Sequence, residues 1–269
     1  MVKISDRLKT AASLVSEGVI LADVGTDHGY VPIYLLEQKK IRCAIAMDIN
    51  KGPLERAKEH IHLYGMDAYI QTRLSDGVAA LQMGEADSIL VAGMGGGLVM
   101  HILEEGKAVC QAADELILQP QSELSGVRDY LAKNGYMIDA ERMVFEDGKY
   151  YPMMRVHYQT GKNKNTDITE KDAALKNAGN CERQDQSRYK VECLYGRHLL
   201  MEKNPILHQY LQKEHKVFET ILDNLLKQPE SEKITARIGE VKESLAVVML
   251  FSLFFAGIFS YEDTNIFNI

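Results

Sequence analysis

The feature that most constrains the fold is a regular alternation of short apolar runs with amphipathic stretches between Val19 and Asn134. Five apolar runs are each closed within two residues by glycine, aspartate or proline: Val19–Val24, Cys43–Met47, Tyr69–Leu74, Ser88–Ala92 and Glu115–Leu118. Stretches with helical spacing follow them at Tyr30–Gln38, Pro53–Tyr64, Val78–Met83, Leu98–Glu105 and Leu124–Asn134. Strands that alternate with helices imply right-handed crossovers and a parallel sheet.

Two further apolar segments, Met137–Phe145 and Tyr150–Tyr158, surround an Asp147-Gly148 turn that is typical of a hairpin. Residues 3–17 carry apolar residues at helical spacing and predict a helix ahead of the first strand. The first 159 residues are therefore expected to form an α/β domain with a mostly parallel, seven-stranded sheet that ends in an antiparallel hairpin.

The rest of the chain has a different pattern. Residues 160–187 are polar and predict a linker, and from Arg188 to Lys227 apolar residues recur at helical spacing. We expect a helical, coiled-coil-like domain over residues 160–244, followed by an apolar tail over 245–269. The apolar run Leu245–Phe259 is shorter than the roughly 20 residues of a membrane span, so a buried or partner-covered helix is expected, with a membrane anchor as the alternative.

Charge and cysteine content narrow the class of protein. The N-terminus lacks a long apolar core, and the four cysteines, at 43, 110, 181 and 193, form no CxxC pair. Free thiols in the cytoplasm are expected, with no zinc site and no signal peptide.

The two parts of the chain differ in charge. Residues 1–159 carry 16 Lys and Arg against 22 Asp and Glu, whereas residues 160–244 carry 15 against 14. A polyanion would therefore be contacted by local cations, for which Arg188, Lys190 and Arg197 are the candidates; a solvated helix face is the alternative.

The most informative motif is the turn that follows the first strand, Asp23-Val24-Gly25-Thr26-Asp27-His28-Gly29. In dinucleotide enzymes this turn cradles a pyrophosphate, which the two carboxylates here would repel. They suit a cofactor with a cationic amino-acid end, such as the ammonium and sulfonium of S-adenosylmethionine. The alternative is a structural turn in which Asp27 caps the next helix. The candidate cofactor residues of this turn are Asp23, Gly25, Thr26, Asp27, His28 and Gly29.

Acidic residues also close the second and third strands. Asp48 lies where an acidic residue hydrogen-bonds the ribose hydroxyls of a bound nucleotide, with Ile49 directly after it. Asp76-Gly77 follows the third strand, and Asp76 could contact either the cofactor's adenine or a target base. Three acidic strand ends in one α/β domain favour a shared binding site.

The fourth and fifth strands end in residues that suit a substrate. Gly93-Met94-Gly95-Gly96-Gly97 would let a substrate approach the backbone closely, and the lysine of a phosphate-binding P-loop is missing. Gln119-Pro120-Gln121 could line a slot for a base or could simply terminate the strand. Asp76, Gly93 and Gln119 are the candidate catalytic residues, and Gly93 also belongs to the candidate cofactor set.

Taken together, these strings resemble the bacterial tRNA adenine-22 N1-methyltransferases. The similar segments are Ser5–Leu8, Ala22–His28, Ser75–Gly77, Val91–Gly96 and Leu116–Pro120, and weaker similarity continues from Tyr195 to Leu211. The resemblance implies a Rossmann-like catalytic domain of the class I methyltransferases, a helical C-terminal domain and methyl transfer from S-adenosylmethionine to N1 of an adenine in tRNA. The alternatives are a class I methyltransferase acting on another RNA, a protein or a small molecule, and an inactive α/β module that binds a partner.

Overall fold

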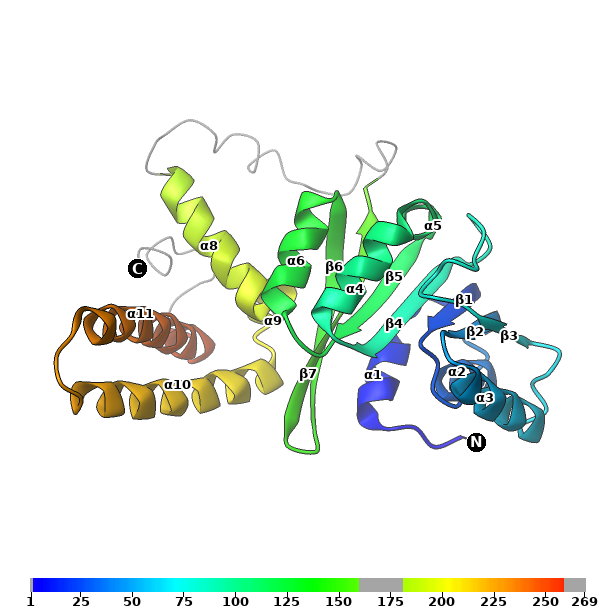
Figure 1. Ribbon diagram of the computed structural model, residues 1–269, viewed down its shortest axis with the longest axis horizontal. Coiled ribbons are helices and arrows are strands. Elements are labelled where there is room, and N and C mark those ends of the chain that lie inside the picture. Colours follow the sequence, from blue (N-terminus) through cyan, green and yellow to red (C-terminus); the bar gives the residue numbers. More distant parts are fainter. Residues whose placement is uncertain (1, 160–180, 259–269) are drawn as a thin grey trace. The chain divides into compact units, whose positions relative to one another are not determined.

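A computed structural model describes residues 2–159 and 181–258 (Figure 1). The chain divides into two compact units, residues 1–166 and 167–269. Each unit is described by itself below.

The first unit is built on one seven-stranded sheet with the strand order β3-β2-β1-β4-β5-β7-β6. Strands β1 to β5 pair in parallel, and β7 runs antiparallel to both β5 and β6. This confirms the predicted parallel sheet with a terminal hairpin. The strands are β1 (Val19–Val24), β2 (Ile41–Asp48), β3 (Ile70–Leu74), β4 (Ser88–Met94), β5 (Glu115–Pro120), β6 (Tyr136–Glu146) and β7 (Lys149–Tyr158).

Helices cover both faces of this sheet and give the unit three layers (Figure 1). One face packs on buried residues of α1, α2 and α3, such as Leu14, Ile33 and Ile61. The other packs on α4, α5 and α6, through residues such as Val99 and Leu131. The six helices are α1 (Asp6–Leu14), α2 (Tyr30–Glu37), α3 (Lys51–Leu63), α4 (Gly96–Glu105), α5 (Lys107–Ala112) and α6 (Leu124–Lys133).

The N-terminus of α1 is held from two directions. Ser5 caps the helix, because its side chain accepts a hydrogen bond from the Leu8 N–H. The carboxylate of Glu146, the last residue of β6, accepts the backbone N–H of Asp6 at 2.7 Å and that of Arg7 at 3.2 Å. A carboxylate at this position also complements the positive end of the helix dipole. The hairpin therefore fixes where α1 begins.

The expected helix over Val78–Met83 is wrong, since this segment forms turns. Its backbone bonds run over three residues, from Ala79 N–H to Asp76 C=O and from Leu81 N–H to Val78 C=O. The Ser75 hydroxyl also accepts the Ala80 N–H at 3.1 Å, which competes with helical pairing. Glycines at both ends leave too few residues for a stable helix.

The second unit is helical, with α8 (Cys181–Tyr195), α9 (Arg197–Met201), α10 (Pro205–Leu226) and α11 (Glu232–Phe255). Helix α8 begins inside the predicted linker 160–187, so the linker prediction is wrong from Cys181 onward; residues 160–180 lie outside the described residues. The helical period of α8 was hidden because the first part of the helix, from Glu182 to Arg188, contains only polar and charged residues.

Helices α10 and α11 pack against each other as a helical hairpin, seen side by side in Figure 1. Asn204 caps α10 by accepting the N–H groups of Ile206 and Leu207. Buried residues of both helices make its core, namely Leu207, Leu211, Val241, Val248, Phe251 and Phe254. The predicted tail begins inside α11, and its residues after 258 lie outside the described chain. Among the described helices, none combines the length and the apolar character needed to cross a membrane.

Candidate active site

The strand order brings the predicted site residues to one edge of the sheet. Parallel strands β3, β2, β1, β4 and β5 are consecutive neighbours, so the segments after their carboxyl ends lie next to one another. The order reverses between β1 and β4, and ligands of open α/β sheets bind in the crevice at such a switch point. The motifs after β1 and β4 flank this point.

The turn after β1 uses backbone conformations that favour glycine. Gly25 has φ +73° and Gly29 has φ +66°, and His28 between them also lies in the left-handed region at φ +63°. Asp27 does not cap α2, because Gly29 occupies the cap position and no side chain bonds there. The Asp27 carboxylate is instead 73% exposed, 3.2 Å from His28 Nε2. The structural alternative for Asp27 therefore fails.

Asp23 is the one carboxylate of this turn that is buried, at 6% exposure. Burial raises the pKa of Asp23 to about 6, the Thr26 side chain lowers it, and the negative charge of Asp48 raises it further. A group whose charged form is disfavoured by its surroundings becomes easier to ionise when a cation arrives. This turn can therefore hold a positively charged group.

At the end of β2, Asp48 keeps part of its hydrogen-bonding capacity. Its Oδ1 accepts the Asn50 N–H at 2.7 Å, whereas Oδ2 accepts no bond from the described residues. Ile49 follows with 58% of its surface exposed, which is unusual for a large aliphatic residue directly after a buried strand. The pair offers a charged acceptor beside an apolar surface, which suits a nucleoside.

The turn after β3 is fixed by a residue that the sequence reasoning missed. The buried hydroxyl of Ser75 donates to the Gly77 carbonyl at 2.9 Å and accepts the Ala80 N–H. Gly77 has φ +50° and its Cα faces Ile102 at close range, so a side chain would be strained there. Asp76 is left exposed between them. The place of Ser75 directly after strand β3 is the sequence feature that could have identified it.

The glycine run Gly93–Gly97 is divided between the end of β4 and the start of α4. Gly93 and Met94 belong to β4, and Gly96 and Gly97 form the first turn of α4. A side chain on Gly96 would overlap the Ser122 carbonyl, so this glycine serves helix packing. Gly93, with φ +80°, remains exposed at the edge. The tip of Met94 occupies the space that a side chain on Gly25 would need. Sequence reasoning missed Met94.

Gln119 is fully buried at the end of β5, and its amide is held on both sides. Its Oε1 accepts the Gly93 N–H at 3.1 Å and Arg7 Nη1 at 2.8 Å, and its Nε2 lies 3.4 Å from the Pro120 carbonyl. The Arg7 guanidinium also lies over the ring of Tyr151, 5.4 Å from its centre. Gln119 therefore joins β4, β5 and α1 and is more than a strand terminator.

Beside the first turn, three rings form a stack. The centroids of His28, Tyr30 and His60 lie 5.0–5.1 Å apart, and His60 Nδ1 is 3.1 Å from the His28 carbonyl. His60 is half-buried here. His28 Nδ1 is buried with no hydrogen-bond partner in the described residues.

The three cations predicted for a polyanion lie in the second unit. Arg188 and Lys190 are on α8, and Arg197 begins α9. Arg188 Nε forms an ion pair with Glu192 at 3.1 Å, whereas Lys190 and Arg197 are exposed. Residues 188 and 190 are two positions apart, so they point to different sides of α8.

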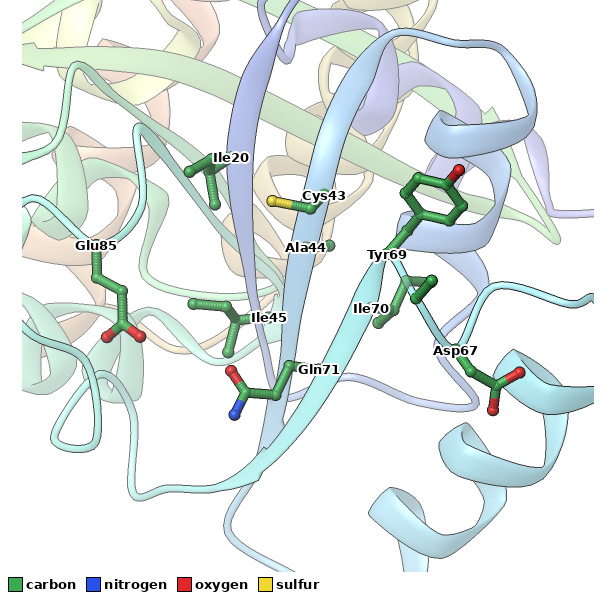
Figure 2. A pocket seen from close by; sticks show the side chains of 10 residues that line it. Ile20, Cys43, Ala44, Ile45, Asp67, Tyr69, Ile70, Gln71 and Glu85 are labelled. Atoms are coloured by element: carbon green, nitrogen blue, oxygen red, sulfur yellow. The ribbon is translucent and has the colours of Figure 1, made fainter.

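A hollow of about 400 Å³ lies elsewhere on the sheet (Figure 2). It is lined by the first residues of β1 and β3 and by the middle of β2, and Cys43, Ile45 and Gln71 project toward Glu85. Arg73 pairs with Glu85 at 2.7 Å and lowers the pKa of that carboxyl to about 2. None of the predicted site residues lines this hollow. No group of three or more His, Cys, Asp or Glu able to hold a metal ion occurs in the described residues.

Comparison with known proteins identifies relatives of nearly full length. Residues 4–154 match the family model for a methyltransferase domain. The tRNA (adenine(22)-N(1))-methyltransferase of Bacillus subtilis is 30% identical over 246 residues, which cover 91% of this chain and 95% of that protein.

Two solved structures carry bound molecules. Streptococcus pneumoniae Sp1610, described as a candidate tRNA (m1A22) methyltransferase in complex with S-adenosyl-L-methionine, is 32% identical with a TM-score of 0.70, over 90% of this chain and 100% of that one. M. capricolum TrmK in complex with S-adenosyl-homocysteine is 26% identical with a TM-score of 0.67, over 91% and 99%.

Proposed function

The chain belongs to the tRNA (adenine(22)-N(1))-methyltransferase family, and from that premise we propose that it transfers a methyl group from S-adenosylmethionine to N1 of adenine 22 in tRNA. The observation that carries the proposal is the arrangement of Asp23 and Asp48 near the carboxyl ends of the neighbouring strands β1 and β2. A tRNA substrate places the reaction in the cytoplasm.

The residues at this edge fit the cofactor. S-adenosylmethionine supplies an electrophilic methyl group on a cationic sulfonium. Asp48 has a free carboxylate oxygen for the ribose hydroxyls, and Ile49 offers an apolar surface for the adenine. The raised pKa of Asp23 makes that buried carboxyl responsive to a cation. The proposed cofactor set is Asp23, Gly25, Thr26, Asp27, His28, Gly29, Asp48, Ile49, Asp76, Gly77 and Gly93.

The chain's own contribution to the reaction is to hold the adenine in place. N1 of adenine carries a lone pair near neutral pH, so alignment with the methyl group matters more than proton removal. Gly93 leaves room for the base, and the buried amide of Gln119 borders the same place. A base that is stacked in the folded tRNA must first be flipped out. Methylation makes the adenine cationic, and the exposed carboxylate of Asp76 can stabilise that charge.

Asp76 has two possible roles that one variant separates. If Asp76 faces the target base, Asp76→Ala slows single-turnover methylation much more than it weakens cofactor binding. If it holds the cofactor's adenine, the two quantities fall in proportion. Rapid-quench methylation and calorimetry on the same preparation measure both, and Asp67→Ala, on an exposed loop, is the matched control.

We also propose that the second unit contacts the tRNA body. The catalytic unit is acidic, so phosphate contacts must come from local cations, and such contacts weaken as salt rises. Replacing Arg188, Lys190 and Arg197 together by alanine should weaken tRNA binding and flatten its salt dependence while cofactor affinity stays unchanged. Unchanged tRNA affinity in the folded triple variant would rule this cluster out.

The whole proposal rests on one direct assay. Wild-type protein is incubated with methyl-labelled S-adenosylmethionine and an unmodified tRNA transcript that carries adenine at position 22. Mass spectrometry of the digested nucleosides should show 1-methyladenosine. A transcript with guanine at position 22 should show none. Label in protein or in small molecules instead of tRNA would favour another methyltransferase substrate, and absence of cofactor binding would favour an inactive module.

A further inference from the structure

Arg7 reaches the candidate active site from outside the motifs that define it. It lies in the first turn of α1, and its guanidinium crosses to the ends of β4 and β5. Nη1 donates to Gln119 Oε1 at 2.8 Å, and a side chain placed on Gly93 would meet the same nitrogen at 3.6 Å. The guanidinium therefore borders both residues that we assign to the slot for the target adenine.

Three contacts fix where this guanidinium lies. The backbone N–H of Arg7 donates to Glu146, so the base of the side chain is tied to the β6/β7 hairpin. The planar group lies over Tyr151 of the same hairpin. Among the described residues no carboxylate forms an ion pair with Arg7. An arginine that is held this firmly without a counter-charge serves some purpose other than surface pairing.

The contact with Gln119 determines which end of its amide faces which way. The last torsion of glutamine is roughly two-fold, so a buried amide can exchange its oxygen and its nitrogen. Two donors, Arg7 Nη1 and the Gly93 N–H, converge on one atom of Gln119 and require it to be the oxygen. The NH2 group is thereby directed away from Gly93, toward the Pro120 carbonyl. Without Arg7, one donor remains and the preference weakens.

We propose that Arg7 is a positioning residue for methyl transfer, which acts by locking the side-chain amide of Gln119 in one orientation beside the target adenine. This inference rests on the proposed function. It adds a residue from the N-terminal helix to a site otherwise built from strand ends.

The test is a double-mutant cycle with Arg7→Met and Gln119→Met. Arg7→Met keeps an unbranched aliphatic side chain and removes the guanidinium with its donors. We expect kcat for tRNA methylation to fall by about 10- to 100-fold, the range for loss of a charge-assisted hydrogen bond, with cofactor Kd within about twofold of wild type. The double variant should be no slower than Gln119→Met alone, because coupled residues are not additive. Arg7→Lys, which retains one donor, should recover part of kcat.

A second measurement does not depend on activity. The side-chain NH2 signals of Gln119 in 15N–1H spectra should be sharp and dispersed in wild type and should broaden or move in Arg7→Met. Arg42→Met, at the opposite edge of the sheet, is the matched control and should change neither kcat nor these signals.

Several outcomes overturn the inference. Unchanged kcat in Arg7→Met does so, as do multiplicative losses in the double variant. A higher KM for tRNA with a flatter salt dependence would show instead that Arg7 contacts a phosphate. If wild-type protein methylates no tRNA, the proposed function fails, and the NMR comparison still decides whether Arg7 orients Gln119.

Discussion

Carboxylates at the amino ends of the strands are bonded to donors within the chain, whereas those at the carboxyl ends are left with unused capacity. Glu115, at the start of β5, is 2% exposed and accepts the backbone N–H of Ser16 at 2.8 Å and its hydroxyl at 2.6 Å. Asp87, just before β4, accepts the Ile20 N–H at 2.7 Å and Arg42 at 2.8 Å. At this edge the acidic residues join elements together.

At the carboxyl ends the same residue types have a different environment. Asp23 is nearly as buried as Glu115, yet no cation of the described residues pairs with it and its pKa rises to about 6. Asp48 keeps an oxygen without a partner. A buried carboxylate without a counter-charge costs stability, so this edge is built to receive a cation from outside. The number of acidic residues does not distinguish the two edges, but their internal partners do.

The largest effect on stability should come from a substitution at the amino edge, the edge of the sheet formed by the amino ends of the parallel strands. Glu115→Ala leaves the Ser16 N–H and hydroxyl without an acceptor and opens a cavity, so the free energy of unfolding should fall by about 3 kcal/mol. Cofactor affinity of the folded protein should not change. Urea denaturation and calorimetry provide the two numbers. Weaker cofactor binding at equal folded fraction would contradict the division between the edges.

Asp23→Asn should have the opposite effect on stability. The folded-state pKa lies near 6, above the ordinary value of 3.8, so the folded protein binds more protons than the unfolded chain between these values. Stability therefore falls as pH rises through that window, and the loss persists above it. Removing the charge should stabilise the ligand-free protein by on the order of 2 kcal/mol at pH 8 and by little at pH 4.

Denaturation curves of both proteins at the two pH values give this difference directly. Cofactor binding by Asp23→Asn should weaken at pH 8. A variant that is less stable than wild type at pH 8 would show that the surroundings of Asp23 favour its charged form.

Asp48→Ala should change binding without changing the fold. Losing charge-assisted bonds to the ribose should weaken S-adenosylmethionine by about 1.5–2 kcal/mol, or roughly 10- to 30-fold, while the free energy of unfolding stays nearly constant. Isothermal calorimetry measures the affinity for the cofactor, and a parallel thermal melt measures the stability. Glu115→Ala should do the reverse, lowering the free energy of unfolding while cofactor affinity stays constant. If both variants change the same one of these two quantities, the proposed difference between the two edges is wrong.

The smallest effect should come from Arg42→Ala. Its guanidinium is 60% exposed, and its partner Asp87 retains the Ile20 N–H. Exposed ion pairs contribute about 0–1 kcal/mol, so stability should change by less than about 1 kcal/mol, with cofactor affinity unaffected. A larger loss in urea denaturation would mean that the amino edge depends on its surface charges as much as on its buried bonds.

The alternation of apolar runs was sufficient to predict the sheet, because the central strands β1, β4 and β5 are largely buried and read as continuous apolar segments. The residues at strand ends could be predicted for the same reason, since parallel strands place their carboxyl ends together. Contacts between segments that are distant in the sequence could not be predicted. The Ser75 hydroxyl bonds to the Ala80 N–H and favours turns where a helix was expected. Helix α8 was missed for another reason, since it lacks the apolar stripe that identifies a helix in a sequence.

The roles of two residues of the candidate site also could not be predicted from the sequence. Arg7 and Met94 lie in segments that are similar to the family, but their roles depend on contacts made across the fold, which the sequence does not reveal. Arg7 reaches Gln119 only because Glu146 holds the start of α1. Local patterns report which strands end in polar groups, whereas side chains that arrive from other elements become apparent only in three dimensions.

The bonds of the N-terminal helix have a consequence for how the molecule acquires its structure. Helix α1 and the residues after it are tied to Glu115, Gln119 and Glu146, which lie 99, 112 and 139–140 positions further along the chain. Loops of this length close late, because their entropy must be lost before the contacts form. We therefore expect the first helix, which is synthesised early, to dock only after the last hairpin has been made. The wall of the adenine slot is then among the last parts to fold, and a chain cut short before β6 would keep its cofactor turn while lacking an ordered place for the base.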